Sequence, residues 1–163
     1  MEVKRIQEGR QRSPPDSRRE ETMRTRTLRG QLNDTNVHQL VVDDGRLSHG
    51  YVIKEFYVWP TGTSGDGVFG VLGTQYDMLP YADAGDNRQI GWAGNTWSTT
   101  GTPTTGNWNV IDPDHVVIQD LYICGTTANN DPTNYLVVLE PLTMTESQTI
   151  LQLIKERSQD DTR

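Results

Sequence analysis

The residues that most often do chemistry in proteins are few in this chain and far apart. Its three histidines, His38, His49 and His115, form no His-x-His or His-x-x-x-His pair, and Cys124 is its single cysteine. A zinc site needs three or four clustered ligands, so this spacing predicts no metal site of that kind. Cys124 ends the apolar run 116–123, and we interpret it as a small buried residue rather than a nucleophile.

The glycine-rich segments lack the motifs of two common enzyme classes. No Gly-x-Ser-x-Gly sequence marks a nucleophile elbow, and the segment 63–65 is not set between a strand and a helix pattern. The glycines of 62–73 are not followed by the Gly-Lys-Ser/Thr of a phosphate-binding loop. We therefore expect a non-enzymatic protein with no catalytic residues and no cofactor, and a hydrolase is the least supported interpretation.

Two loop segments carry the oxygen ligands that hard cations prefer. Asp83 and Asp86 belong to the sequence Asp-Ala-Gly-Asp-Asn, and residues 129–131 read Asn-Asn-Asp. Neither segment matches an EF-hand loop, and aspartate and asparagine are also the ordinary residues of turns. We expect turns here and no assigned metal site, with a cation near Asp83 and Asp86 left open.

Three tryptophans support the strongest alternative function. Trp92, Trp97 and Trp108 fall within seventeen residues and flank a polar loop. Exposed tryptophans beside polar residues could stack on sugar rings, as in a carbohydrate-binding or host-recognition module. The simpler interpretation is that they supply core area to a chain with two phenylalanines, because strand alternation would bury at least Trp92 and Trp108.

The sign of the charge changes along the chain. Residues 1–30 hold nine basic and five acidic side chains, a net charge of +4, whereas the remaining 133 residues hold six basic and seventeen acidic ones, a net charge of −11. Such a polar arm cannot bury enough surface to offset its ordering entropy, so we expect it to bind a neighbouring molecule. The candidate partner-binding residues of the arm are its arginines, Arg5, Arg10, Arg12, Arg18, Arg19, Arg24, Arg26 and Arg29.

The acidic remainder restricts the classes of partner. No lysine or arginine occurs between Arg88 and Lys155, and such a surface repels phosphate backbones. The arm has acidic neighbours beside its arginines and no interleaved aromatic residue, so we do not expect nucleic acid as the partner. No apolar stretch is long enough for a bilayer span and none follows the basic start, so neither a membrane nor a secretory signal is expected.

The central part of the chain has the pattern of a β protein. Asp-Asp-Gly at 43–45 closes the first expected strand, and the 46–59 strand has an imperfect alternation that predicts a bulge near Gly50 or Glu55. The two most apolar strands, 115–124 and 135–140, are expected to form an antiparallel hairpin. Short strands, many glycines and polar loops favour an all-β fold, an antiparallel β-sandwich of jelly-roll type, over a small open barrel. The expected strands are 38–42, 46–59, 68–76, 88–93, 108–111, 115–124 and 135–140.

One C-terminal helix is expected over 144–158. Thr145 and Gln148 have the spacing of a capping box, and an apolar stripe follows, made of Ile150, Leu151, Leu153 and Ile154. The stripe could cover the chain's own sandwich or dock onto a neighbour. The expected organisation is an extended basic arm at 1–30, a β-sandwich body at 31–142, and the helix with a polar tail at 143–163.

Three segments carry a resemblance to a known class of protein. The stretches 43–47, 111–118 and 134–141, read DDGRL, IDPDHVVI and NYLVVLEP, and with them most of the chain from about residue 27, resemble small virion proteins of tailed phages of marine bacteria. The resemblance implies a structural part of a virion assembled in the host cytoplasm. Among such parts, a capsid decoration (cement) protein fits a compact β-body with an arm.

The resemblance and the charge pattern together imply the partners. They are the major capsid protein and sister copies of this chain, in a homo-oligomer such as a trimer. An extended arm of thirty residues reaches roughly 100 Å, and its guanidinium groups pair bidentately with carboxylates on acidic surfaces. Weak contacts repeated over a closed lattice add by avidity. Removing residues 1–29 is expected to leave a folded body that no longer binds particles.

Overall fold

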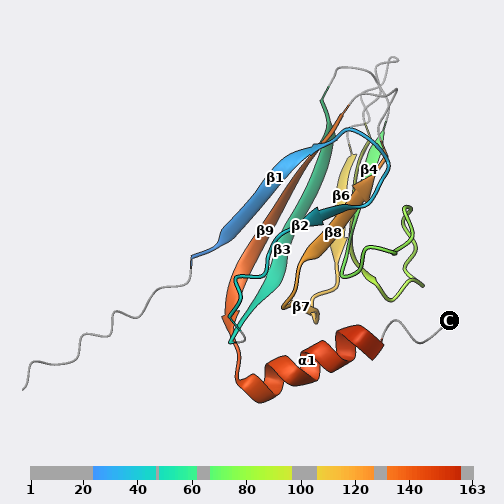
Figure 1. Cartoon of the computed structure of the whole chain (residues 1–163). Helices are drawn as coiled ribbons and strands as arrows, with labels where there is room; N and C mark the ends of the chain where they lie inside the picture. The colour runs from blue at the N-terminus through green and yellow to red at the C-terminus, as the bar shows by residue number, and fades with distance from the viewer. Residues whose placement is uncertain (1–23, 47, 62–66, 97–105, 127–131, 159–163) are drawn as a thin grey trace, which may run out of the picture.

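The computed structural model describes residues 24–46, 48–61, 67–96, 106–126 and 132–158, which form a β-sandwich and one helix (Figure 1). The strands and the helix are β1 (Arg26–Leu32), β2 (His38–Leu40), β3 (His49–Pro60), β4 (Val68–Gly73), β5 (Gln89–Thr96), β6 (Gly106–Ile111), β7 (Val116–Val117), β8 (Leu121–Gly125), β9 (Thr133–Thr143) and α1 (Glu146–Ser158). The expectation of an all-β body with a single C-terminal helix is confirmed in the described part of the chain.

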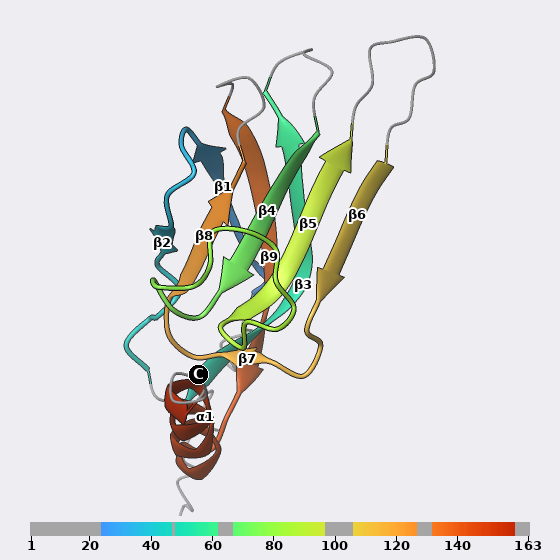
Figure 2. The same ribbon diagram turned by 90° about the vertical axis from the view of Figure 1, so that its right-hand side faces the viewer.

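The strands form two antiparallel sheets that face one another (Figures 1 and 2). Sheet A has the order β1-β9-β3-β7, and sheet B has the order β2-β8-β4-β5-β6. The pairing is nested, because β1 pairs with β9, β2 with β8, and β3 with β7, while β4 pairs with β5 near the middle of the chain. Strands distant in sequence therefore lie side by side in sheet A and in the β2, β8 and β4 part of sheet B, whereas β4, β5 and β6 are consecutive.

The core lies between the two sheets and is built from alternate residues of their strands. Each fully buried aliphatic or aromatic side chain contributes roughly 1.5–3 kcal/mol relative to exposure, which holds the two layers together. The central core residues are Ile53, Phe56, Val137 and Leu139 from sheet A and Leu72, Ile90, Leu121 and Ile123 from sheet B.

Several local expectations are confirmed. The register between β3 and β9 shifts between Ile53 and Glu55, so a bulge occurs at the second of the two expected places. Gly45 adopts φ 74°, a left-handed conformation that suits glycine and ends the Asp-Asp-Gly turn. At the start of α1, Gln148 N–H donates to Thr145 Oγ1 at 3.3 Å and Thr145 N–H donates to Gln148 Oε1 at 2.9 Å, which is the expected capping box.

The expected hairpin between 115–124 and 135–140 is wrong. The first of these stretches is two strands, with β7 in sheet A and β8 in sheet B, and the second lies in β9 of sheet A. The chain changes sheets near Asp120, whose carboxylate accepts hydrogen bonds from the N–H groups of Val42 at 2.7 Å and Asp43 at 3.1 Å. The continuous apolar run thus marks a crossing between layers, and both of its ends face the core.

The boundary of the arm also needs correction. Residues 26–30, which were assigned to the arm, belong to β1 and pair with β9 from Arg26 opposite Leu139 to Gly30 opposite Tyr135. The sheet accepts them because Leu28 and Leu32 point into the sandwich while Thr27 and Arg29 point outward. Residues 1–23 of the arm lie outside the described residues.

Candidate functional site

The helix α1 lies across one end of the sandwich (Figures 1 and 2), and the residues that it buries against the body are polar. Thr149 and Glu156 are buried there, and Gln152 Nε2 donates to the carbonyl oxygen of Val116 at 3.1 Å. Glu156 Oε1 lies 3.5 Å from Nε2 of the buried His115, and the carbonyl oxygen of Glu156 accepts a hydrogen bond from Gln75 Nε2 at 3.3 Å. Polar contacts therefore seat this helix.

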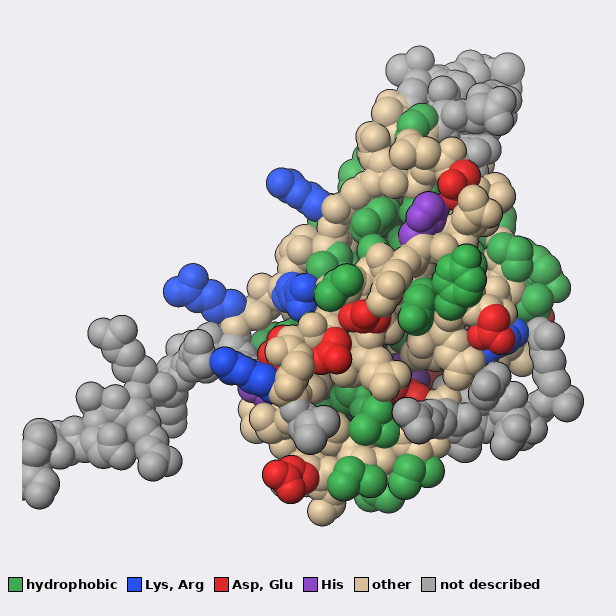
Figure 3. All heavy atoms as spheres, in the orientation of Figure 1, with side chains coloured by type: hydrophobic (Ala, Val, Ile, Leu, Met, Phe, Trp, Pro, Cys, Tyr) green, Lys and Arg blue, Asp and Glu red, His purple; other side chains and the backbone are tan. Residues whose placement is uncertain are grey.

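The apolar side of α1 faces outward. Three of the four residues of the expected stripe are exposed, Ile150 at 56 %, Leu151 at 67 % and Ile154 at 59 %, and we call these three side chains the α1 ridge. Leu153 is half-buried. Figure 3 shows hydrophobic side chains along the side of the helix that points away from the sandwich. This orientation is the reverse of the usual one for a surface helix, whose apolar stripe faces the core.

An open groove continues the α1 ridge toward sheet A. It has a volume of ≈ 370 Å³ and lies between α1 and the end of β9. Leu151 contributes to both the ridge and the groove, and Leu142, which is 40 % exposed, forms the β9 side. The other lining residues are Val116, Thr143, Met144, Gln148, Gln152 and Lys155. The ridge and the groove form one apolar surface at this end of the molecule.

A second apolar surface lies on the outer face of sheet B. Trp92 and Val110 are directly opposed on β5 and β6, and so are Gly94 and Trp108, so all four residues share this face. Trp108 lies over Gly94, where a Cβ atom would come within 2.4 Å of the indole ring. Trp108 is 46 % exposed, so the expectation that it is buried is wrong, whereas Trp92 is half-buried as part of a small cluster with Val71.

The three tryptophans do not form a demonstrated sugar-stacking platform. The indole Nε1 of Trp92 donates to Gln89 Oε1 at 2.7 Å, which holds its ring against the protein. Trp97 lies outside the described residues. Of the expected set, the structure thus presents Trp108 as an accessible ring and Trp92 as a partly covered neighbour.

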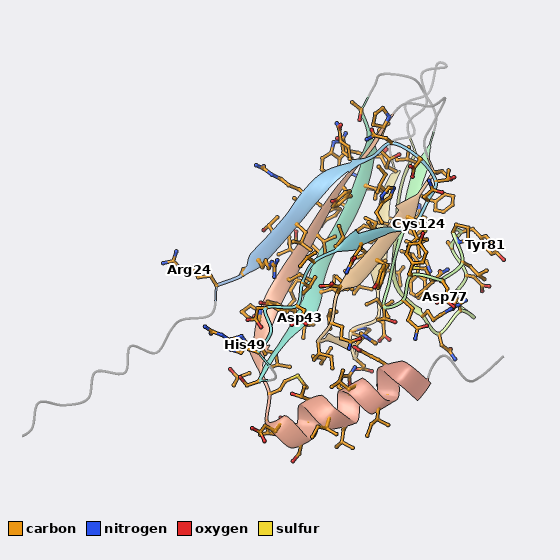
Figure 4. The ribbon with its side chains drawn as sticks, in the orientation of Figure 1. Arg24, Asp43, His49, Asp77, Tyr81 and Cys124 are labelled. Carbon is orange, nitrogen blue, oxygen red and sulfur yellow. The ribbon has the colours of Figure 1, made fainter. Side chains whose placement is uncertain are left out.

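The loop 74–88 covers part of sheet B on the side away from sheet A, and Figure 4 shows Asp77 and Tyr81 on this loop. Gln89 ties the loop down, because its Nε2 donates to the carbonyl oxygens of Leu79 at 3.0 Å and Tyr81 at 2.8 Å. Met78 packs beneath the loop against Val71 and Cys124. The loop is therefore a fixed part of the outer surface.

Where the sequence left a cation open near Asp83 and Asp86, the structure places an arginine beside the Asp86 carboxylate. Asp86 accepts from Arg88 Nε at 2.7 Å and from Arg88 Nη2 at 3.0 Å, and the Leu79 N–H donates to it at 3.0 Å. Asp83 Oδ1 accepts a hydrogen bond from the N–H group of Gly85, which lies in the same turn. Burial acts to raise the pKa of Asp86, but the hydrogen bonds from Arg88 and Leu79 outweigh it and lower that pKa.

Each of the three histidines lies beside a carboxylate. The spacing of residues along the sequence did not indicate all three of these pairs. His38 Nε2 lies 2.7 Å from Asp34 Oδ1, and His49 Nδ1 lies 2.7 Å from Asp44 Oδ2. The first two pairs join a turn residue to the first residue of a strand, β2 or β3, and the third pair lies between α1 and the body, so each has a local structural role. Within the described ranges, no three His, Cys, Asp or Glu side chains gather to hold a metal ion.

Cys124 is buried on β8, as expected, and burial raises the pKa of its thiol to about 11. A thiol with this pKa and no exposure is a poor nucleophile at neutral pH. The helix in the described part of the chain is too short and too polar to cross a bilayer.

The arginines of the expected arm fall into three groups: one that bonds within the chain, two that are exposed, and five that lie outside the described residues. Arg26 is used within the chain, because its Nη1 and Nη2 atoms donate to the carbonyl oxygens of Val42 and Val41, each at 2.8 Å. Arg24 and Arg29 are exposed, and Arg24 projects from the start of β1 (Figure 4). The arginines whose position lies outside the described residues are Arg5, Arg10, Arg12, Arg18 and Arg19.

Sequence reasoning missed the buried Asp86–Arg88 pair, and it left the orientation of α1 open. The stripe of α1 was visible, but a periodic pattern does not say whether its apolar face meets the same chain or another one. No protein-family model matches the chain, and comparisons with curated proteins and with solved structures found no significant match.

Proposed function

We propose that this chain is a non-enzymatic virion structural protein, a capsid decoration protein that binds the shell through the end of the sandwich that carries α1. The observation that carries the proposal is the orientation of α1, which buries polar residues and exposes Ile150, Leu151 and Ile154. Contiguous exposed apolar side chains mark surfaces that bind other molecules. The resemblance of the sequence to small phage virion proteins supplies the class of partner, the major capsid protein.

We also propose that the sandwich is a jelly roll. In that architecture one long hairpin is rolled up, so that the first strand pairs with the last, the second with the last but one, and so on inward. The nested pairing of β1 with β9, β2 with β8 and β3 with β7 supports this description, with β6 as an additional strand beyond β5. Jelly rolls occur among viral capsid domains and also among lectins, so the topology alone does not select a function.

The start of β1 lies along the half of β9 that is nearer to α1. Arg26 pairs with Leu139 near the C-terminal part of β9, and Leu32 pairs with Thr133 at the other end of that strand. The start of β1 therefore lies toward the helix, and the exposed Arg24 extends from it. An arm that leaves from the start of β1 could bind the same partner as the α1 ridge, with its guanidinium groups on carboxylates of the shell or of a sister copy.

The area that three apolar side chains and a groove can bury is smaller than that of a standard interface, which buries about 800 Å² on each partner. A single copy would therefore bind weakly through this surface. Many copies on a closed shell, each with an arm contact, would add by avidity, and this suits a protein that decorates a lattice.

Two experiments test this proposal. Mass spectrometry of purified particles of the phage that encodes the chain should detect it as a virion component, and its absence would contradict the proposal.

Purified Leu151→Asp protein should bind such particles, stripped of the native protein, at least tenfold more weakly than wild type. The matched control is Tyr81→Asp, which adds the same charge at an exposed apolar side chain on the loop 74–88, away from the ridge (Figure 4). Equal binding by Leu151→Asp and wild type would show that the ridge does not bind the shell.

Carbohydrate recognition is the second candidate function, and the half-exposed ring of Trp108 on a flat sheet face favours it. Glycan-array binding that is lost in Trp108→Ala would support it over shell binding. No binding to any glycan by the full chain would leave the decoration role as the supported function.

A further inference from the structure

The outer edge of β6 is unlike the other sheet edges in the described residues. Edge strands of soluble proteins are normally short, charged, interrupted by proline or bulged, which prevents pairing with other chains. In sheet B, β2 has three residues, and in sheet A, β7 has two. The remaining edge, β1, carries Arg26 and Arg29. In contrast β6 has six residues, an unbroken register with β5, and no charge or proline.

The side chains of β6 are also unusually open. Asn107, Trp108, Asn109 and Val110 are all exposed, so side chains on both faces of the middle of this strand reach solvent. Figure 2 shows β6 at the margin of sheet B, with no labelled strand beyond it. The strand therefore has an open edge, with exposed side chains on both of its faces.

The hydrogen-bonding groups at this edge can be assigned by alternation. The Asp112 N–H donates to the Ile90 carbonyl oxygen at 2.9 Å, so residues with even numbers on β6 direct their backbone groups toward β5. Asn107, Asn109 and Ile111 consequently direct their N–H and C=O groups away from β5, toward the open edge. These three residues offer three donors and three acceptors in a row.

We propose that β6 pairs antiparallel with β6 of a second copy of this chain about a two-fold axis at Asn109, which joins the two B sheets into one ten-stranded sheet. The axis is perpendicular to the sheet, so the outer faces of both copies stay on the same side. In this register Asn109 faces the partner's Asn109, and Asn107 faces the partner's Ile111. All three outward-directed residues of each strand are then paired, which gives six backbone hydrogen bonds.

The side chains are self-complementary in the same register. Trp108 of one copy is opposite Val110 of the other, an aromatic and β-branched pair of the kind that stabilises antiparallel strands. The same combination already occurs within the chain, where Trp92 is opposite Val110. Two continuous apolar rows would cross the joined sheet, from Val71 and Trp92 of one copy to Trp108 of the other, and the reverse.

The charge distribution favours a second copy as the occupant. The chain has a net charge of −7, so two copies repel one another over most of their surfaces. The segment 89–111, which forms β5, β6 and their connection, contains no charged residue. The first acidic residue after β6, Asp112, would lie opposite the partner's Gly106, away from the partner's acidic side chains. An isologous contact at this edge therefore brings together two uncharged surfaces.

The test is the solution mass of the full chain by light scattering or sedimentation equilibrium, for wild type and three variants at Asn109. Asn109→Asp leaves the contacts of the single copy unchanged, because this side chain is exposed, but places two carboxylates opposite each other on the axis. Asn109→Pro removes a donor that points to solvent in the single copy, where an edge strand tolerates proline. Asn109→Thr is the matched control, since it keeps the N–H group and favours a strand.

We expect wild type and Asn109→Thr to have a mass twofold higher than Asn109→Asp and Asn109→Pro, with the circular dichroism of a folded β protein in all four. A monomeric wild type would overturn the proposal. An Asn109→Asp mass equal to that of wild type would also overturn it, because it would place the contact elsewhere. The inference uses neither the α1 ridge nor a shell, so its failure would leave the proposed function untouched.

Discussion

Substitution of Asp86 by asparagine should destabilise the protein strongly while changing few atoms. The side chain of Asp86 is 3 % exposed and that of Arg88 is 9 % exposed, and they meet at 2.7 Å. Removing the charge of one partner from a buried pair costs about 3–5 kcal/mol, because the other charge stays buried without compensation. Arg88 keeps its contact with Asp77 at 2.8 Å, so we expect the lower end, about 3 kcal/mol.

For a chain of this size each kcal/mol lowers Tm by about 2–4 °C, so the Asp86→Asn variant should melt about 6–12 °C below wild type. Urea unfolding followed by tryptophan fluorescence measures the free energy directly. The matched control is Asp77→Asn, which removes the other carboxylate of the same guanidinium but is 64 % exposed. It should cost less than about 1 kcal/mol, as exposed pairs do. Equal losses in the two variants would refute the reasoning from burial.

Three further predictions concern pH, α1 and the thiol. The pKa values of Asp86 and Asp120 are lowered in the folded protein, so their stabilisation is complete above the ordinary value of 3.8 and is lost as pH falls through the folded values. Urea unfolding across this range should show the loss, with a smaller slope in Asp86→Asn. Thr145→Ala should cost about 1 kcal/mol and speed amide exchange within α1, whereas Thr145→Ser should not. Cys124 should react with a thiol reagent after denaturation and not before, since burial raises its pKa to about 11.

The local features of this fold could be predicted from sequence because each depends on neighbouring residues. The capping box needs Thr145 and Gln148 three positions apart, and the turn before β3 needs Asp-Asp-Gly. The bulge near Glu55 followed from imperfect alternation within one strand. Such signals depend on a few neighbouring residues, so the fold of the rest of the chain does not alter them.

The long-range features could not be predicted in the same way. The apolar run that contains Val117 and Ile123 is consistent with one long strand, and only the distant partners of β7 and β8 show that it crosses between sheets. The orientation of α1 depends on which surface Thr149 and Glu156 meet. The pairing of Asp86 with Arg88 was overlooked because an Asp- and Asn-rich loop suggests a turn or a cation before it suggests a buried ion pair.

The corrected boundary of the arm changes how it should be tested. Removing residues 1–29 would delete half of β1, including Arg26 and its bonds to Val41 and Val42, and would weaken sheet A itself. A truncation that begins at Arg24 keeps the strand intact. Loss of particle binding by that shorter truncation would then report on the arm alone.

The most direct test of the proposed function is an electron cryomicroscopy map of the encoding phage's particle in which this chain can be traced. We predict that Ile150, Leu151 and Ile154 are buried against the major capsid protein, with the start of β1 beside the same contact. A traced copy whose α1 ridge faces solvent, or a particle that lacks the chain, would contradict it.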